Sequence, residues 1–88
     1  MNARSTNRAR QERDYAVMRG QFLGDFPRCD RCLNPATEVH HARGRQGWRL
    51  LYVLWWVPLC HGCHQWVTDN PTAAIYDGYS LSRLGGAA

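Results

Sequence analysis

The sequence predicts a small α+β domain that is held together by a bound zinc ion. With 88 residues, the chain has room for one domain with a thin core, and domains of this size usually need a staple such as a metal ion. Four cysteines in two Cys-x-x-Cys pairs offer that staple. Helical patterns near both ends of the chain flank short segments with the residue types of β-strands. A multidomain enzyme is therefore excluded.

The distribution of apolar residues argues against a membrane protein and against secretion. The longest mostly apolar run covers residues 50–59, which is half of the roughly 20 residues that span a bilayer. Residues 1–13 are polar and Arg-rich, and they lack the apolar core of a secretory signal. We therefore expect a protein without a membrane segment, in a compartment that keeps thiols reduced.

Basic residues exceed acidic residues by 11 to 7, which gives a formal net charge of +4. All of the basic residues are arginine, whose planar guanidinium group binds phosphate with two hydrogen bonds. A nucleic-acid partner explains this composition, and so does a GC-rich genome that encodes arginine in place of lysine. Under the first explanation, binding weakens steeply as the salt concentration rises.

Residues 1–28 are predicted to form an Arg-rich lead-in and a helix over residues 8–23. The helix is indicated by apolar side chains at positions i, i+3, i+7 and i+11, namely Tyr15, Met18, Phe22 and Phe26. Three polar residues before it are candidates for its N-cap: Ser5, Thr6 and Asn7. Gly24 and Pro27 are expected to end the helix.

Residues 29–77 are predicted to form the core of the domain, which begins with a turn and two extended segments. A tight turn at residues 29–32 leads into a short strand over residues 37–41. A loop that carries Arg43, Arg45 and Arg49 follows. The apolar residues 50–59 are then expected to form a buried segment of β type.

The second half of this core is predicted to be helical. A tight turn at residues 60–63 includes Gly62, because such turns often need the positive φ that glycine adopts. A helix begins over residues 64–68 and ends before Pro71, since the residue before proline leaves the α region. Pro71 opens a second short helix, and residues 78–88 follow as a C-terminal tail.

The four cysteines have the spacing of a structural zinc site. Two residues between a pair of thiolates let both bind one tetrahedral Zn²⁺ at about 2.3 Å. Two disulfides are the competing interpretation, but a reducing compartment disfavours them, and a thioredoxin-like motif needs only one pair in a βαβ unit. We therefore expect one structural zinc ion, held by Cys29, Cys32, Cys60 and Cys63.

The four histidines are predicted to gather in one place. Adjacent residues of a strand point to opposite faces, so His40 and His41 are expected to do different jobs, one as a metal ligand and the other as a base. His64 lies about 100° around the helix from Cys63, which turns it toward the strand that carries His40. His61 is either a further ligand or an exposed residue of the second turn.

The tryptophans divide between the core and the surface. In a chain with so small a core, aromatic residues usually fill it, and we expect this of Trp56 and Trp66. Trp48 lies in the arginine-rich loop and is the better candidate for stacking on a nucleobase.

Three motifs occur in the order found in one family of nucleases. They are Cys29-x-x-Cys32, Glu38-Val39-His40-His41 and Trp56-Val57-Pro58-Leu59-Cys60-x-x-Cys63-His64. This arrangement resembles the HNH endonucleases in their four-cysteine form, and it is similar to the small HNH proteins of bacteriophages and prophages. The resemblance covers residues 29–71, about half of the chain, and it is specific because several motifs keep their order.

The resemblance implies a treble-clef-like ββα-metal core with a structural zinc ion beside it. In such a core His40 and His64 would bind a catalytic divalent cation such as Mg²⁺ or Mn²⁺, and His41 would be the general base. Arg43 and Arg45 lie where phosphate-binding residues would be useful. The implied activity is hydrolysis of DNA phosphodiester bonds in the cytoplasm of a bacterial host cell, with a phage terminase subunit as an implied partner.

The chain departs from the family motif at one residue. The Asn of the motif usually lies just ahead of the strand that leads into the third cysteine, where this chain reads Leu54-Trp55-Trp56-Val57. That Asn commonly fixes the loop that holds the base, or contributes to the metal site. A backbone carbonyl can also orient a histidine, and would serve in its place.

Two other functions stay open from the sequence. A non-catalytic zinc-binding module that holds DNA or a protein partner fits the small size and the missing Asn. A nuclease directed at RNA or tRNA fits the same motifs. The sequence predicts neither the target nor the oligomeric state.

Overall fold

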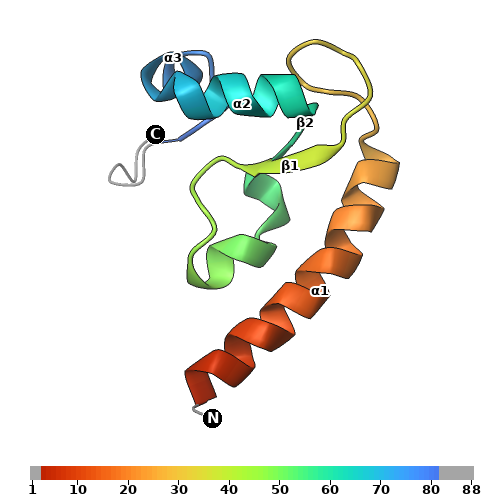
Figure 1. The fold of residues 1–88 in the computed structure, drawn as a ribbon, viewed down its shortest axis with the longest axis vertical. Coiled ribbons are helices and arrows are strands. Elements are labelled where there is room, and N and C mark those ends of the chain that lie inside the picture. Colours follow the sequence, from red (N-terminus) through yellow and green to blue (C-terminus); the bar gives the residue numbers. More distant parts are fainter. Residues whose placement is uncertain (1–2, 82–88) are drawn as a thin grey trace.

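The computed structural model describes residues 3–81 and shows a small α+β domain, which confirms the α+β class and leaves the ββα-metal core a prediction (Figure 1). A two-stranded antiparallel sheet lies between a long N-terminal helix and two shorter helices. In chain order the elements are α1 (Ala3–Asp25), β1 (Glu38–His41), the 3-10 helices η1 (Gly47–Leu51) and η2 (Val53–Trp55), β2 (Trp56–Leu59), α2 (His61–Asp69) and α3 (Pro71–Tyr76). Over these described residues, no helix combines the length and the apolar content needed to cross a membrane.

Helix α1 is longer than the sequence predicted. It covers Ala3–Asp25, whereas the apolar stripe indicated residues 8–23. The three candidate N-cap residues lie inside the helix, so their assignment as caps is wrong: Ser5, Thr6 and Asn7. Each such residue costs well under about 1 kcal/mol in a helix, and a helix continues through them when nothing stops it. Gly24 is helical as well, and the chain leaves the helix at Phe26, just before Pro27.

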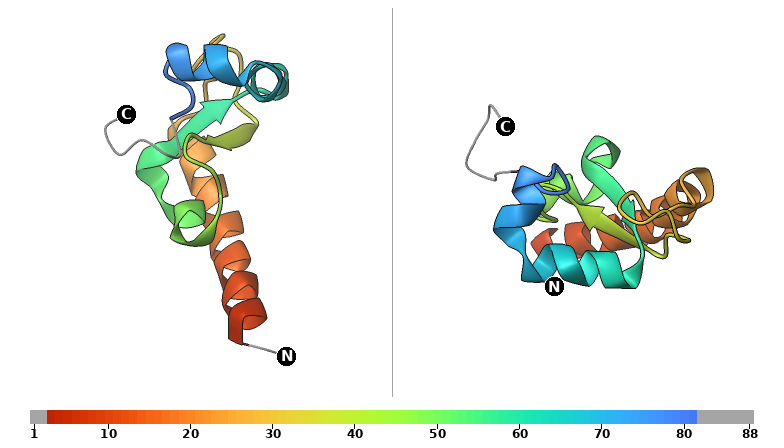
Figure 2. Two further views of the ribbon diagram at one scale, coloured as in Figure 1. Left: turned by 90° about the vertical axis from the view of Figure 1, so that its left-hand side faces the viewer. Right: turned by 90° about the horizontal axis from the view of Figure 1, so that it is seen from above.

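One face of α1 packs on the sheet. Phe22 is buried with Val39 and Trp56, and Tyr15 covers this cluster from the same helix. The rings of Phe22 and Trp56 meet edge to face, with 5.4 Å between their centroids. Phe26, the last residue of the stripe, lies beyond the helix and is 54% exposed. The N-terminal end of α1 projects past the sheet and the shorter helices (Figure 2).

The connection between the two strands is helical rather than extended. The strand predicted over residues 37–41 is confirmed to within one residue. The prediction of β structure throughout residues 50–59 is wrong in its first half, where η1 and η2 replace extended chain. Leu50 is fully buried, and its carbonyl accepts a hydrogen bond from Trp56 Nε1 at 3.1 Å. Apolar content alone does not separate a short buried strand from a helical turn.

Helix α2 begins at His61, three residues earlier than predicted, because Cys60 caps it. The Cys60 Sγ accepts a hydrogen bond from the backbone N of Cys63. Pro71 opens α3 as predicted, and Gly78 follows that helix in the left-handed conformation with φ of 89°. These helices enclose a second core cluster against β2, made of Cys29, Leu59, Cys63, Val67 and Ala74.

The start of the predicted C-terminal tail returns to the sheet. The backbone N of Tyr79 donates to the carbonyl of Ala74 at 2.9 Å, and the N of Leu81 donates to the carbonyl of Ala42 at 2.7 Å. Ser80 therefore lies beside the end of β1. The rest of the predicted tail, from residue 82 to residue 88, lies outside the described residues.

Phe22→Ala is expected to lower the free energy of unfolding by about 3 kcal/mol, because it leaves a cavity between α1 and the sheet. Val17→Ala is the matched control on the same helix, where the side chain is 62% exposed, and it should change stability by less than about 0.5 kcal/mol. Urea unfolding of the zinc-loaded protein, followed by tryptophan fluorescence, measures both. Equal losses would contradict the packing of α1 on the sheet.

Candidate functional site

The four cysteine thiols converge on one point. The Sγ atoms of Cys29, Cys32, Cys60 and Cys63 all lie within 4.8 Å of one another, and all four thiols are free. The sulfur atoms of Cys32 and Cys60 lie 3.6 Å apart. Around a tetrahedral Zn²⁺ with bonds of about 2.3 Å, sulfur atoms lie roughly 3.8 Å apart. The cysteines therefore form a cluster that fits one zinc ion.

The two cysteine turns are built differently. In the first, the backbone N of Leu33 donates to the carbonyl of Cys29 at 2.9 Å, and Leu33 itself takes the left-handed conformation with φ of 69°. That conformation costs a non-glycine residue roughly 1–2 kcal/mol. The second turn is the first turn of α2, which is right-handed throughout. The expectation of a positive φ at Gly62 is therefore wrong, since a helical turn needs none.

Four thiols this close to one another need a cation when they ionise. Burial and hydrogen bonds with the neighbouring thiols raise the pKa of Cys63 to about 12, against the lowering effect of Arg31. Burial also raises the pKa of Cys29, but backbone hydrogen bonds, the strongest from Cys60, outweigh it and lower that pKa to about 6. Arg31 donates to the Sγ of Cys63 at 3.6 Å and stacks 3.9 Å from the centroid of Trp66. A bound Zn²⁺ would neutralise the thiolate charge that this cluster cannot otherwise hold.

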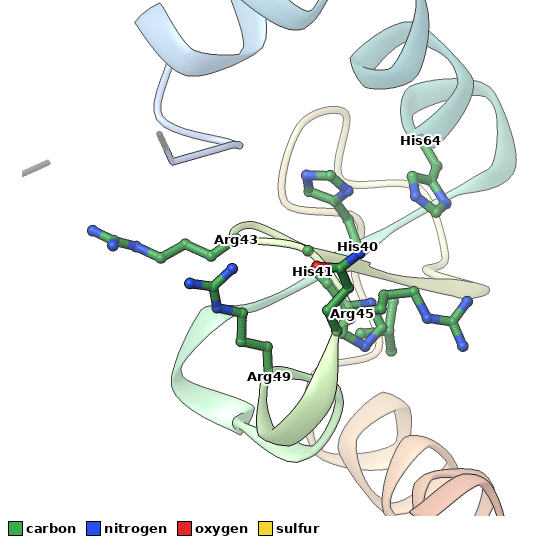
Figure 3. A pocket seen from close by; sticks show the side chains of 9 residues that line it. His40, His41, Arg43, Arg45, Arg49 and His64 are labelled. Atoms are coloured by element: carbon green, nitrogen blue, oxygen red, sulfur yellow. The ribbon is translucent and has the colours of Figure 1, made fainter. Parts of the chain in front are cut away.

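A pair of histidines, His40 on β1 and His64 on α2, lies between these two elements. The rings of His40 and His64 meet edge to face with 5.2 Å between their centroids (Figure 3). Strand alternation turns His40 toward α2 and His41 toward α1. On α2, His64 follows Cys63, and the rotation of about 100° per residue turns it from the zinc cluster to the strand. The structure thus brings together the two histidines that the sequence predicted to meet.

Glu38 fixes the proton on His64. Its two carboxylate oxygens accept hydrogen bonds from Nδ1 of His61 and Nδ1 of His64, each at 2.7 Å. A carboxylate only accepts, so His64 carries its proton on Nδ1 and leaves Nε2 as the nitrogen with a free lone pair. The hydrogen bonds from His61 and then His64 lower the pKa of Glu38, which keeps it ionised. The side chain of His61 is 79% exposed, as expected of a turn residue.

Ser80 holds the other histidine of the pair. The Nε2 of His40 lies 2.8 Å from the Oγ of Ser80. The Nδ1 of His40 is the ring nitrogen that Ser80 does not contact. Burial, followed by the charge of His64, lowers the pKa of His40 to about 4. The ring is therefore neutral at pH 7, as a metal-binding imidazole must be. Neither Glu38 nor Ser80 was identified from the sequence as a site residue.

His41 lies on the opposite face, buried against aromatic rings. It is 7% exposed and packs 5.3 Å from the ring centroid of Tyr15 and 5.6 Å from that of Trp56. Burial, followed by the charge of Arg45, lowers the pKa of His41 to about 4. Its Nε2 is buried and has no hydrogen-bond partner among the residues that the structure describes. A buried acceptor without a partner costs about 1–3 kcal/mol, which favours a role in binding over one in packing.

Backbone carbonyls of the segment between the strands contact His41 and its neighbours. The carbonyl of Leu50 hydrogen-bonds to His41 and also accepts from Nε1 of Trp56. At the base of the same loop, the backbone N of Ala42 donates to the carbonyl of Trp55 at 2.8 Å. The buried Leu50 thus holds the ring of His41 from a fixed 3-10 turn.

One cavity of about 370 Å³ joins the histidines to a set of arginines (Figure 3). Its charged and titratable lining consists of three histidines and three arginines: His40, His41, His64, Arg43, Arg45 and Arg49. Arg45 lies over the ring of Tyr15 on α1, at 5.2 Å from the centroid. In Figure 3, Arg43 and Arg49 lie on one side of the histidines and Arg45 lies on the other. Arg49 was placed in this loop by the sequence but was not identified as a site residue.

The donors for a second metal ion are fewer than those of the cysteine cluster. Among residues 3–81, the cysteines are the only group of three or more ligand-type side chains close enough to share an ion. His40 and His64 supply two nitrogen donors, so a divalent cation held there would complete its shell with water or substrate. Nitrogen donors suit Mn²⁺ or Zn²⁺ better than Mg²⁺, which prefers oxygen. No family model, curated protein or solved structure matches this chain.

Protein purified under reducing conditions is expected to contain about one zinc ion per chain, because four thiols converge on one point. Cys63→Ser should lose most of that zinc and unfold at a lower temperature, since it removes one of four thiolates. His61→Ala, which changes an exposed residue of the same turn, should keep it. Elemental analysis and thermal unfolding measure both effects. A wild-type protein without zinc, or one whose unfolding a chelator leaves unchanged, would contradict the assignment.

Stability is expected to fall with acid in part because of His41. Its pKa is about 4 in the folded protein and about 6.5 when unfolded, so between these values the unfolded chain binds the extra proton. The wild type should therefore lose on the order of 2 kcal/mol more than His41→Gln between pH 7 and pH 4.5. Denaturant unfolding at both pH values measures this, and zinc release by acid cancels in the comparison. Equal losses for the two proteins would contradict the low pKa of His41.

Proposed function

We propose that this protein is a metal-dependent endonuclease that hydrolyses phosphodiester bonds of DNA. The observation that carries the proposal is the cavity, which is lined by three histidines and three arginines; one of these histidines, His41, has a buried Nε2 without a hydrogen-bond partner among the described residues. This set combines a proton acceptor, nitrogen donors for a cation and groups that bind phosphate. Each of the three is a part that phosphodiester hydrolysis requires.

His41 is the general base in this proposal. Its low pKa keeps the imidazole neutral at pH 7, so that the unpartnered Nε2 can accept the proton of an attacking water molecule. The carbonyl of Leu50 holds the ring while this happens. A bound phosphodiester brings negative charge next to the ring, which raises the pKa of His41 toward the working pH. The proton transfer then becomes more favourable than in the free protein.

His40 and His64 are the proposed ligands of the catalytic cation. When bound, a divalent cation such as Mn²⁺ or Mg²⁺ supplies a Lewis acid for the charge that develops on the phosphate and the leaving oxygen. Glu38 accepts from Nδ1 of His64 and thereby fixes the tautomer of that ring, and Ser80 contacts Nε2 of His40, so that one further nitrogen of each ring is left for the cation. Hydrogen bonds to the far side of a ligand ring raise the basicity of the ligand and reduce the entropy lost on binding.

Arg43, Arg45 and Arg49 bind phosphates of the DNA backbone in this proposal. They line the cavity on two sides, and among the described residues no acidic side chain lines it. Arg43 lies 4.7 Å from the ring centroid of Trp55, and Arg45 stacks on Tyr15. These cation–π contacts hold the long side chains in place and lower the entropy cost of a phosphate contact.

The order of the elements supports membership of the HNH family. Strand β1 carries His40 and His41, β2 leads into the second cysteine turn, and α2 carries His64 beside the strand. This is the order β-β-α that the sequence resemblance implies for a ββα-metal core. The proposed origin in a phage or prophage, and a terminase subunit as partner, rest on that resemblance alone.

A second candidate is a zinc-stapled module that binds DNA without cutting it. The burial of His41 favours it, because a base that is 7% exposed leaves little room for a water molecule and a phosphate. The absent motif Asn favours it as well. In that case the arginines still bind phosphate, and the three histidines of the cavity are structural.

Wild-type protein is expected to nick supercoiled plasmid in the presence of Mn²⁺ or Mg²⁺. His41→Ala should lower the rate by about 100-fold or more, because it removes the base. Gln65→Ala is the matched control, since Gln65 is an exposed residue of α2 bonded only to Asp69, and it should leave the rate within about twofold. Gel electrophoresis of the plasmid forms measures the three rates.

Two results would contradict the proposal. Folded, zinc-loaded wild type that binds the plasmid but nicks it with neither metal would favour the binding module. Equal nicking by the wild type and His41→Ala would overturn the role of His41 and point to a contaminating nuclease.

A further inference from the structure

Two exposed aromatic rings and one half-buried ring form a patch on the 3-10 segments between the strands. This aromatic patch consists of Trp48, Tyr52 and Trp55. The Trp48 ring lies 5.3 Å from that of Tyr52 and 5.4 Å from that of Trp55, and the latter two are 4.6 Å apart, all measured between centroids. None of the three belongs to either core cluster of the described residues. The patch therefore needs an explanation other than the folding of the core.

Trp48 is the outermost ring of the patch and is held in position. It is 59% exposed, whereas Tyr52 is 37% exposed, and the contacts with both neighbouring rings fix its orientation. A ring that is held before binding loses little side-chain entropy when a ligand stacks on it. The exposed indole of Trp48 can therefore stack on a flat ligand at a small cost in entropy.

Two arginines connect the patch to the histidine cavity. Arg43 lies over the ring of Trp55 at 4.7 Å, and Arg49 lies 5.9 Å from the centroid of Trp48. Both also line the cavity, and Figure 3 shows them extending to the same side of the histidines. Between Glu38 and Asp69 the sequence contains no acidic residue. The segment that carries the patch is therefore cationic, which favours a phosphate-bearing ligand over a protein surface of mixed charge.

We propose that the aromatic patch stacks an unpaired nucleobase, while Arg43 and Arg49 bind the phosphates beside it. Inside a duplex both faces of each base are covered by its neighbours, so an internal base offers a face to Trp48 only where the strand is single or locally opened. Stacking of one base on an aromatic side chain is worth about 1–3 kcal/mol and tolerates any sequence. The inference deepens the proposed function, because it names DNA with a single-stranded segment as the preferred substrate.

The test compares three ligands of equal length in a buffer without added Mg²⁺ or Mn²⁺. They are a labelled single strand, a strand of the same length in which every nucleotide is abasic, and the blunt duplex. Fluorescence anisotropy of the zinc-loaded protein measures each affinity. Trp48→Ala is expected to weaken binding of the single strand about 10-fold, which corresponds to about 1.4 kcal/mol. It should change the affinities for the abasic strand and for the duplex by less than about twofold.

Two further variants separate stacking from charge. Tyr76→Ala removes an aromatic side chain that is 90% exposed on α3, away from the patch, and should change none of the affinities. Arg49→Ala should weaken the binding of all three ligands together and reduce its dependence on salt, because it removes a phosphate contact. Zinc content and the unfolding temperature of each variant confirm that it is folded.

The outcomes are separate from those of the nicking assay. If Trp48→Ala weakens binding of the single strand and the abasic strand alike, or of neither, the stacking proposal is wrong. If the same variant instead abolishes self-association in sedimentation, the patch is an interface between copies of the chain, and the proposal is likewise wrong. A selective loss for the single strand supports it even if the protein nicks no plasmid, since no step of the assay requires cleavage.

Discussion

The convergence of the four thiols is the constraint on which the rest of the structure depends. The cluster joins the turn before β1 to the turn that ends β2, and backbone hydrogen bonds support it, from Asp30 to Pro58 at 2.8 Å and from Thr37 to Leu59 at 3.1 Å. Because Cys63 lies in the first turn of α2, an ion that fixes its sulfur also fixes the rotation of that helix. The rotation then decides that His64 faces β1. A zinc ion without a chemical role would thereby set the geometry of the cavity.

Much of the fold could be predicted because its signals are local. The first strand, the start of α3 at Pro71 and the cysteine cluster all follow from short patterns, and the structure has each of them. The segment before β2 could not be predicted in the same way. Its apolar residues fit a strand as well as a turn, and the choice depends on Leu50, whose burial and hydrogen bond to Trp56 are tertiary facts. The additional helical residues at the start of α1 were not predicted, because weak helix formers do not by themselves end a helix.

The candidate site could be predicted only in part, for a similar reason. Strand alternation and helix rotation place His40 and His64 together without any knowledge of tertiary contacts. The residues that hold these rings come from elsewhere in the chain: Glu38 lies 26 residues before His64, and Ser80 lies 40 residues after His40. A signal for Glu38 existed, since a residue two positions before His40 shares its face of the strand. Ser80 offers no such signal, because its place depends on how the chain returns after α3.

The loop between the strands has a consequence for how such a protein can change over evolution. Its two ends meet at one hydrogen-bonded pair, where the N of Ala42 donates to the carbonyl of Trp55. The entropy cost of closing a loop grows slowly with its length, so exposed residues of this loop can be added or exchanged at a small cost in stability, as long as the buried Leu50 keeps its place. His40 and His64 lie outside the loop and keep their spacing when it changes. Mutations in the loop can therefore change the preference for a ligand without changing the arrangement of the histidine pair.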